Sequence, residues 1–157
     1  MADMPSVSKL PERIAGNDIE LRIDAADLWP DIGRLTSAQR AELRREIPWL
    51  DTEAIYTDKA RYEAWAKNTA ILERKMPQRL FWMRNAQGEL VGIITARIPE
   101  NGNVLVTGRM VFSDRRSKGY GTKASRALSD AALASGLVAY VCAETLPDNE
   151  ASARSLL

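Results

Sequence analysis

The sequence predicts an α/β (or α+β) fold with a mixed, mostly antiparallel sheet flanked by helices. Apolar runs over residues 80–84, 90–98 and 104–112 are separated by a turn signal, Asn85–Gly88, and a hairpin signal, Asn101-Gly102. They therefore predict an antiparallel meander of three strands. A glycine-containing loop, a helical pattern and another apolar run follow, an order that predicts two parallel strands joined by a helix.

The N-terminal part of the chain predicts one more strand. Residues 1–17 contain Pro5, Pro11 and several polar residues, and we interpret them as an arm without a core of its own. The segment Ile19–Ile23 alternates apolar and polar residues, which indicates a strand. Residues 18–157 are therefore predicted to form a single domain.

Three helical patterns precede the meander. Asp24 is a candidate N-cap for a short first helix, and Thr36–Gln39 has the capping-box spacing that opens a second helix, ending before Pro48. Thr57-Asp58 can cap a third helix that runs to about Met76. We interpret the apolar stripes of the first and third helices as core: Leu28, Ile32, Leu35, Tyr62, Trp65, Thr69, Leu72 and Met76.

The last two predicted elements are a helix and a strand. The helix starts at about Thr122 and ends at Gly136, a residue type favoured just after a helix C-terminus. The run Leu137–Ala143 is apolar on both faces, which predicts a buried strand parallel to strand 104–112, with Tyr140 and Cys142 in the core. The apolar stripe of the helix consists of Ala124, Ala127, Leu128, Ala131 and Ala132.

The composition is that of an ordinary globular protein and excludes several kinds of site. Of 157 residues, 45% are hydrophobic and 27% charged, and the net charge of +1 gives no reason to expect nucleic acid or a membrane as partner. Cys142 is the one cysteine and no apolar run reaches membrane-spanning length, so we expect a cytoplasmic protein. The sequence contains no histidine, which excludes histidine catalysis and histidine-ligated metal sites, and we expect no metal.

The segment Arg116–Gly121 combines glycines with cations between a predicted strand and a predicted helix. Glycine lets the backbone approach a ligand closely, and the N–H groups of a first helical turn have no partners within the helix. Such a loop is suited to hold an anion.

Three interpretations of this loop stay open. Gly119–Ala124 fits the dinucleotide-binding pattern G-x-G-x-x-A, with Glu144 roughly 20 residues further on; against it, Ser113–Lys118 separate the strand from the first glycine. The segment also fits a turn with solvated charges. The third interpretation takes the whole unit: strand, R-x-x-G-x-G, helix, strand, and then Asp148-Asn149-x-x-Ser152.

This whole unit resembles the GNAT superfamily of N-acetyltransferases, and within it the branch of ribosomal-protein N-terminal acetyltransferases. The resemblance runs from Pro11 to Leu157; it is most specific over Gly108–Gly121 and Asp148–Ser152, and weaker at Pro48-Trp49-Leu50. It implies the GNAT-type acyl-CoA N-acyltransferase fold. It also implies transfer of an acetyl group from acetyl-CoA to a primary amine of a small molecule or a protein, such as a protein N-terminus.

The resemblance also implies roles for individual residues. A backbone N–H of Met110 or Val111 would polarise the thioester carbonyl, in a gap where their strand diverges from the strand carrying Tyr140 and Val141. Asn149 would contact the pantetheine arm, Ser152 would protonate the leaving CoA thiolate, and Trp49 would line the acceptor cleft. The pyrophosphate of acetyl-CoA would be held by Arg116, Ser117, Lys118, Gly119, Tyr120, Gly121 and Thr122.

Direct attack on the thioester requires an unprotonated amine, so a base or a water chain must remove a proton. Without histidine, the candidate bases are Glu144, Glu150 and Glu53, and each also fits an ordinary surface carboxylate.

One departure from the family concerns its C-terminal part. Members of the family continue past the helix of Asn149 and Ser152 with a hairpin of two strands, which this sequence lacks. We therefore expect an open sheet edge at strand 137–143, which a second copy of the chain could complete. The alternative function is a non-catalytic acyl-CoA-binding or interaction protein.

Overall fold

The computed structural model describes residues 7–23, 28–46, 58–73, 78–99 and 102–143, which form one six-stranded sheet with the strands in chain order. Neighbouring strands are antiparallel, except that β5 and β6 are parallel. The predicted mixed, mostly antiparallel sheet is therefore confirmed. The strands are β1 (Arg13–Gly16), β2 (Ile19–Arg22), β3 (Gln78–Asn85), β4 (Leu90–Arg97), β5 (Val104–Val111) and β6 (Tyr140–Ala143).

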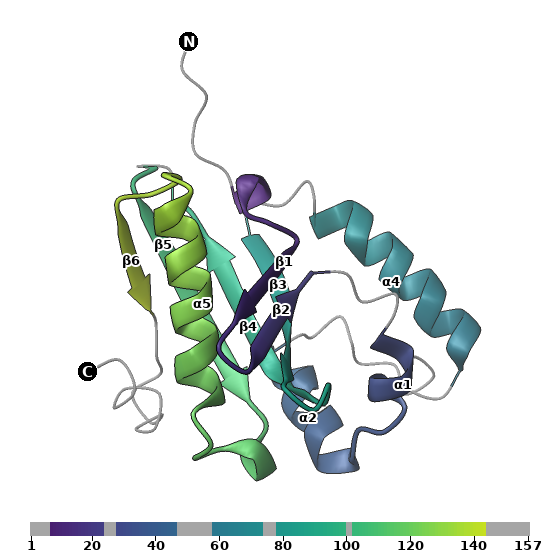
Figure 1. Cartoon of the computed structure of the whole chain (residues 1–157). Coiled ribbons are helices and arrows are strands. Elements are labelled where there is room, and N and C mark those ends of the chain that lie inside the picture. The colour runs from purple at the N-terminus through teal and green to yellow at the C-terminus, as the bar shows by residue number, and fades with distance from the viewer. Residues whose placement is uncertain (1–6, 24–27, 47–57, 74–77, 100–101, 144–157) are drawn as a thin grey trace.

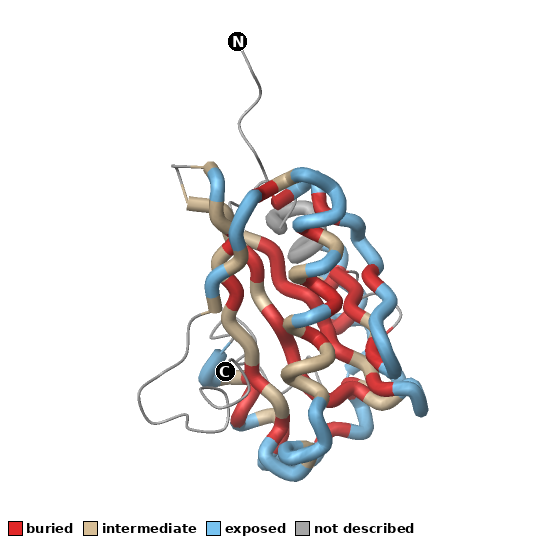
Figure 2. Tube along the Cα trace, turned by 60° about the vertical axis from the view of Figure 1, so that its left-hand side comes forward, coloured by how far each residue is buried: buried red, intermediate tan, exposed pale blue. Residues whose placement is uncertain are grey.

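Helices cover both faces of the sheet (Figure 1). Helix α5 packs on one face, where its side chains and those of β1 and β2 share one core cluster. Residues of α1, α2 and α4 share a second cluster with the opposite faces of β3, β4 and β5. The tube in Figure 2 shows the buried residues concentrated along the central strands. The helices are η1 (Val7–Lys9), α1 (Trp29–Ile32), α2 (Ser37–Glu46), α4 (Lys59–Glu73), η4 (Ser113–Arg115) and α5 (Tyr120–Ala134).

The described part of the predicted N-terminal arm, residues 7–17, is packed on the domain rather than free. It forms η1 and β1, and Val7, Leu10 and Ile14 are buried in the α5-side core. The buried Arg79 holds this segment by donating hydrogen bonds to the carbonyl oxygens of Ser8 and Leu10. In the sequence, Val7, Leu10 and Ile14 stand among proline and polar residues, so they form no periodic pattern from which their packing could be predicted.

The capping box predicted for the second helix is present. The backbone N–H of Gln39 donates to Thr36 Oγ1 at 3.1 Å, and the N–H of Thr36 donates to Gln39 Oε1 at 2.9 Å. Asp58 caps α4 in a similar way, because its Oδ1 accepts from the N–H groups of Ala60 and Arg61. The predicted caps Asp24 and Thr57 lie outside the described residues.

Thr36→Ala should lower the free energy of unfolding by about 1 kcal/mol, because the N–H of Gln39 loses its acceptor at the start of α2. Urea denaturation followed by circular dichroism measures this change. The neighbouring Ser37→Ala is the control, since Ser37 is exposed and its hydroxyl accepts a long hydrogen bond, 3.4 Å from Arg40. Equal unfolding midpoints for the two variants would contradict the capping role.

Gly92 lies at an irregularity in the central sheet. Glycine inside a strand predicts a bulge or a close backbone approach, and both are present. The register between β3 and β4 shifts so that Met83 faces Gly92 while Arg84 faces Leu90. A Cβ built on Gly92 would fall on the carbonyl oxygen of Met110 in β5. Gly92 therefore lets β4 approach β5 closely at Met110 and Val111, the two residues of β5 that belong to the predicted site.

The prediction that strand 137–143 is buried is wrong. β6 forms only over Tyr140–Ala143, and Tyr140 and Cys142 are exposed, with 67% of Tyr140 accessible. β6 is the last strand in the sheet order, and only its other face, through Val141, packs on the α5-side core. An apolar run alone does not reveal an edge position. That a second copy of the chain completes the sheet at this edge stays a prediction.

Candidate functional site

The predicted anion-binding loop lies where β5 ends and α5 begins. Residues Arg116–Gly119 connect η4 to α5, and α5 starts at Tyr120, two residues earlier than the sequence pattern indicated. Gly119 is the N-cap residue, in the left-handed region with φ of 79°, and no side chain among the described residues caps the helix. The N–H groups of the first turn of α5 therefore remain available at the positive end of the helix dipole. This arrangement suits a phosphate.

Cations add to the positive potential of this helix end. Arg116 and Lys118 are exposed on the loop itself. Arg109 of β5 reaches beneath the first turn of α5, where its Nη1 donates to the carbonyl oxygen of Gly121 at 2.8 Å and to Ser125 Oγ. Burial lowers the pKa of the Arg109 guanidinium, which still remains charged at neutral pH. The described part of the site thus carries a positive charge that favours an anionic ligand.

The structure distinguishes between the two backbone donors that the sequence left open. The N–H of Phe112 donates to the carbonyl oxygen of Val91 in β4 at 3.0 Å. Successive N–H groups of a strand point to opposite edges, so the N–H of Met110 also faces β4. The N–H of Val111 faces the opposite edge, the side on which β6 lies. This alternation favours Val111 as the donor to a ligand.

The described part of β6 covers only the first half of that edge. Val104–Thr107 of β5 lie opposite Tyr140–Ala143, and β5 then continues to Val111. Tyr140 and Val141 are themselves paired with Val104 and Leu105, so the strands are not apart at these two residues. The expected divergence of the two strands nearer Met110 and Val111 stays a prediction. A gap beside β5 can begin only after Thr107.

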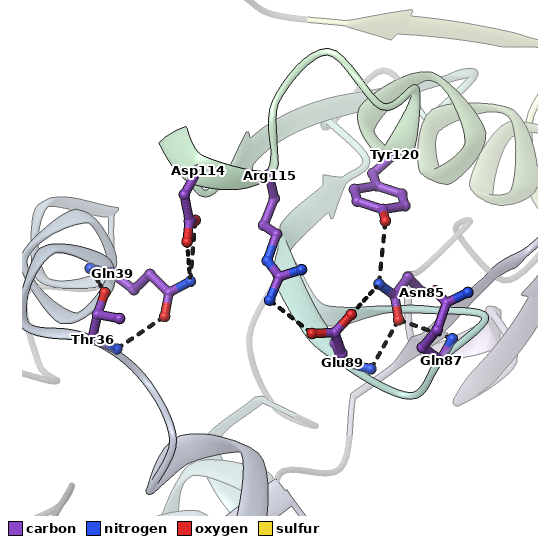
Figure 3. Close-up of polar contacts among 8 residues, drawn as sticks. All are labelled: Thr36, Gln39, Asn85, Gln87, Glu89, Asp114, Arg115 and Tyr120. Carbon is purple, nitrogen blue, oxygen red and sulfur yellow. Dashed lines mark hydrogen bonds and ion pairs between the residues drawn. The ribbon is translucent and has the colours of Figure 1, made fainter.

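A chain of polar contacts connects both ends of the loop to the turn between β3 and β4 (Figure 3). Arg115, just before the loop, donates to Glu89 Oε2 at 2.7 Å. Tyr120, just after the loop, accepts at its hydroxyl from Asn85 Nδ2 at 3.2 Å. Asn85 Nδ2 also donates to Glu89 Oε1 at 3.1 Å, which joins the two contacts. We call Asn85, Glu89, Arg115 and Tyr120 the loop clasp.

Helix α2 holds η4 from the other side. Gln39 Nε2 donates to both carboxylate oxygens of Asp114 at 3.1 Å. Glu42 accepts from the N–H of Ser113 at 3.0 Å and from the Ser113 hydroxyl. Gln39 and Glu42 are themselves buried. The short segment between β5 and the loop is thereby fixed between α2 and the β3–β4 turn.

The structure brings together the predicted residues of the loop and of the end of β5, and the other predicted site residues lie outside the described ones. Met110 and Val111 end β5, and Arg116–Thr122 form the loop and the first turn of α5. Glu144, Asn149, Ser152 and Trp49 lie outside the described residues, as do Glu53 and Glu150. The described residues contain no group of three His, Cys, Asp or Glu side chains that could hold a metal. Among them, too, no helix is both long and apolar enough to cross a bilayer.

Sequence reasoning missed the residues that support the loop. Asn85 was recognised only as part of a turn, and Glu89 and Glu42 were not singled out. Gln39 was recognised as a capping residue, which says nothing of its bond to Asp114. No local pattern in the sequence signals the contacts of these residues with Ser113, Asp114, Arg115 and Tyr120, since each of these contacts joins residues far apart in the chain.

The clasp should be visible in the titration of Glu89. Hydrogen bonds from Asn85 and then from Arg115 lower the pKa of the Glu89 carboxyl below its ordinary value. The contacts therefore stabilise the folded chain above the ordinary pKa, and this contribution is lost as the pH falls through the lowered value. Asn85→Ala should raise the pKa of Glu89, as measured by carboxyl-carbon NMR titration. An unchanged pKa of Glu89 in Asn85→Ala would contradict the contribution of this hydrogen bond.

Comparison with known proteins decides which family the site belongs to. The sequence profile described as the acetyltransferase (GNAT) domain matches residues 21–157. The chain belongs to this family. This GNAT protein is thus an acetyltransferase by descent, and it has the GNAT acyl-CoA N-acyltransferase fold. Comparison with curated protein sequences found no match.

Solved structures of acetyltransferases share the fold of this GNAT protein. RimL, a ribosomal L7/L12 alpha-N-protein acetyltransferase in complex with coenzyme A, is 17% identical with a TM-score of 0.68, over 92% of this chain and 80% of that one. The microcin C7 self-immunity acetyltransferase MccE, in complex with acetyl-CoA and AMP, is 13% identical with a TM-score of 0.66. The match covers 88% of this chain and 76% of MccE. An acetyltransferase from Salmonella typhimurium that modifies the N-terminal serine of ribosomal protein L7/L12 is 17% identical, with a TM-score of 0.63. The match covers 92% of this chain and 81% of that one.

Family membership also bears on the dinucleotide interpretation of the loop. A dinucleotide-binding domain needs several parallel strands beside its glycine loop. Among the described strands of this GNAT protein, β5 and β6 form the one parallel pair. The glycine pattern at Gly119–Ala124 is therefore better explained as the acetyltransferase loop.

Proposed function

We propose that this protein binds acetyl-CoA at the loop between η4 and α5 and transfers its acetyl group to a primary amine by direct attack on the thioester. The observation that carries this proposal is the uncapped N-terminus of α5, preceded by Gly119 in the left-handed region and placed beside the end of β5. The same end of the molecule thus offers donors for a pyrophosphate and, in Val111, a backbone donor for a carbonyl oxygen.

In this proposal the loop and β5 have separate roles. The N–H groups of Ser117–Thr122 bind the pyrophosphate, and Arg116 and Lys118 add charge. The N–H of Val111 donates to the thioester oxygen, where negative charge develops as the amine attacks. Met110 contributes its side chain to the core on the α2 and α4 side, while its N–H is directed to β4. MccE and RimL, whose structures hold acetyl-CoA and coenzyme A, support acetyl-CoA as cosubstrate.

The remaining chemical steps are proposed for residues outside the described part. The amine nitrogen forms a bond to the thioester carbon, a base removes its proton, and the carbon–sulfur bond breaks. Ser152 would return a proton to the CoA thiolate, and Asn149 would contact the pantetheine arm. Glu144 is the proposed base, which typically contributes about 10² to 10⁴ in rate. Trp49 would line the acceptor cleft.

A protein N-terminus is the acceptor that the relatives support. RimL and the Salmonella typhimurium enzyme act on the N-terminus of a ribosomal protein. MccE, a self-immunity acetyltransferase, has the same fold. We therefore propose a primary amine as the acceptor, with a protein N-terminus as the case that RimL and the Salmonella typhimurium enzyme support.

The test is an acetyl-transfer assay analysed by mass spectrometry. The full chain is incubated with acetyl-CoA and two sets of acceptors, peptides with free N-terminal Ser or Ala and small primary amines. An acetylated product, made at least tenfold more slowly by Ser152→Ala, supports transfer. Binding of acetyl-CoA without any product, unaffected by Ser152→Ala, would instead favour the non-catalytic acyl-CoA-binding function.

A further inference from the structure

The acetyl-CoA loop has little to hold it in place by itself. Residues Arg116–Gly119 are all exposed. Two of them adopt left-handed backbone conformations, Ser117 with φ of 66° and Gly119 with φ of 79°. For Ser117 this conformation costs about 1–2 kcal/mol, because its Cβ approaches the following carbonyl oxygen. The surroundings of the loop must therefore maintain its shape.

The loop clasp meets this need at both ends of the loop. The residue before the loop, Arg115, contacts Glu89, and the first residue after the loop, Tyr120, contacts Asn85. These two side chains of the β3–β4 turn are themselves joined by a hydrogen bond. Asn85 is buried and uses its whole amide, because its oxygen accepts from the N–H groups of Gln87 at 3.0 Å and Glu89 at 2.9 Å. Its nitrogen is left for Glu89 and Tyr120. The distance between the two ends of the loop is thus set by one turn.

We propose that Asn85 and Glu89 are positioning residues for acetyl-CoA, acting through Arg115 and Tyr120 on the geometry of the pyrophosphate-binding loop. This inference rests on the proposed function, and it adds residues that touch neither the cosubstrate nor the acceptor. The Glu89–Arg115 ion pair is only partly buried, so its contribution to folding stability should be small. Misplacement of a binding group by about 1 Å is far more costly to function. Loss of the clasp should therefore weaken cosubstrate binding with little effect on stability.

The experiment measures acetyl-CoA affinity by isothermal titration and stability by urea denaturation for variants of the full chain. Glu89→Gln and Arg115→Gln each remove the ion pair, and both should raise the dissociation constant about tenfold. Arg115→Lys keeps a cation facing Glu89 and should bind within about threefold of the wild type. Glu63→Gln removes an ion pair distant from the loop, the exposed Lys59–Glu63 pair on α4, and should bind as the wild type does. All four variants should have similar urea midpoints.

The outcomes separate this inference from the proposed function. If the wild type binds acetyl-CoA and Glu89→Gln binds equally well, the clasp has no positioning role while the proposed function stands. If Arg115→Lys binds acetyl-CoA as weakly as Arg115→Gln, a cation facing Glu89 is not enough to position the loop, and the inference is overturned. A folded wild type that binds no acetyl-CoA contradicts the proposed function, and the inference with it. Amide NMR shifts of residues 116–120, altered in Glu89→Gln but not in Glu63→Gln without ligand, would support the clasp independently.

Discussion

Gly92→Ala should lower the free energy of unfolding by about 3 kcal/mol or more and abolish acetyl transfer. The new methyl group would fall on the Met110 carbonyl oxygen and approach the Cα of Val111 to 3.0 Å. These are backbone atoms in the middle of the sheet, so neither can move aside without separating β4 from β5. Overpacking of this kind costs typically about 1–3 kcal/mol and sometimes more. Urea denaturation and the acetyl-transfer assay measure the two effects.

Gly108→Ala is the matched control for this change. Gly108 also lies within a central strand, but a Cβ there would meet only the Thr95 hydroxyl, at 3.2 Å. A side-chain hydroxyl can move by a few tenths of an ångström, so the free energy of unfolding should change by less than about 1 kcal/mol. Similar losses of stability in the two alanine variants would show that the close approach of Gly92 to β5 is not what requires glycine.

Gly119→Val should reduce acetyl-CoA affinity at least about 100-fold while leaving the protein folded. Gly119 has φ of 79°, a conformation that β-branched residues almost never adopt. The loop backbone must therefore change, and the N–H groups at the start of α5 lose their shared direction. The packing of α5 through Ala124 and Leu128 is not affected, because a Cβ at Gly119 meets nothing within 4 Å. Isothermal titration with acetyl-CoA measures the loss.

Gly136→Val controls for the backbone strain itself. Gly136 follows the other end of α5 with φ of 70°, and a Cβ there also meets nothing within 4 Å. It should lose a comparable amount of stability but bind acetyl-CoA within about threefold of the wild type, since it lies away from the helix N-terminus. A wild-type affinity in Gly119→Val would exclude this loop as the pyrophosphate site. Gly121 is less suitable for such a test, because a Cβ there would come within 2.9 Å of Arg109 Nε.

The sequence predicted those parts of the structure that depend on neighbouring residues. Thr36 and Gln39 of the capping box lie only 3 positions apart in the sequence, and both hydrogen bonds of the box are present. The antiparallel meander followed from turn residues between apolar runs, and β3, β4 and β5 pair as expected. The glycine loop was located because strand, loop and helix are consecutive.

Features that depend on the tertiary arrangement were not predictable in the same way. The apolar run of β6 indicated burial on both faces, but only the face with Val141 packs on the α5-side core, while Tyr140 and Cys142 on the other face are exposed. The two contacts of the clasp that reach the loop ends join residues 26 and 35 positions apart, and no periodic pattern marks them. The choice between Met110 and Val111 required the direction of the Phe112 N–H, which comes from strand pairing.

The most direct test of the account is an amide NMR titration of the full chain with acetyl-CoA. The N–H groups proposed to bind the cosubstrate are those of Val111 and Ser117–Thr122, so their resonances should shift first and most. The N–H of Met110 faces β4 and should move less than that of Val111. Saturation at micromolar acetyl-CoA with this pattern would support the site. Shifts centred elsewhere, or none in a folded protein, would contradict it.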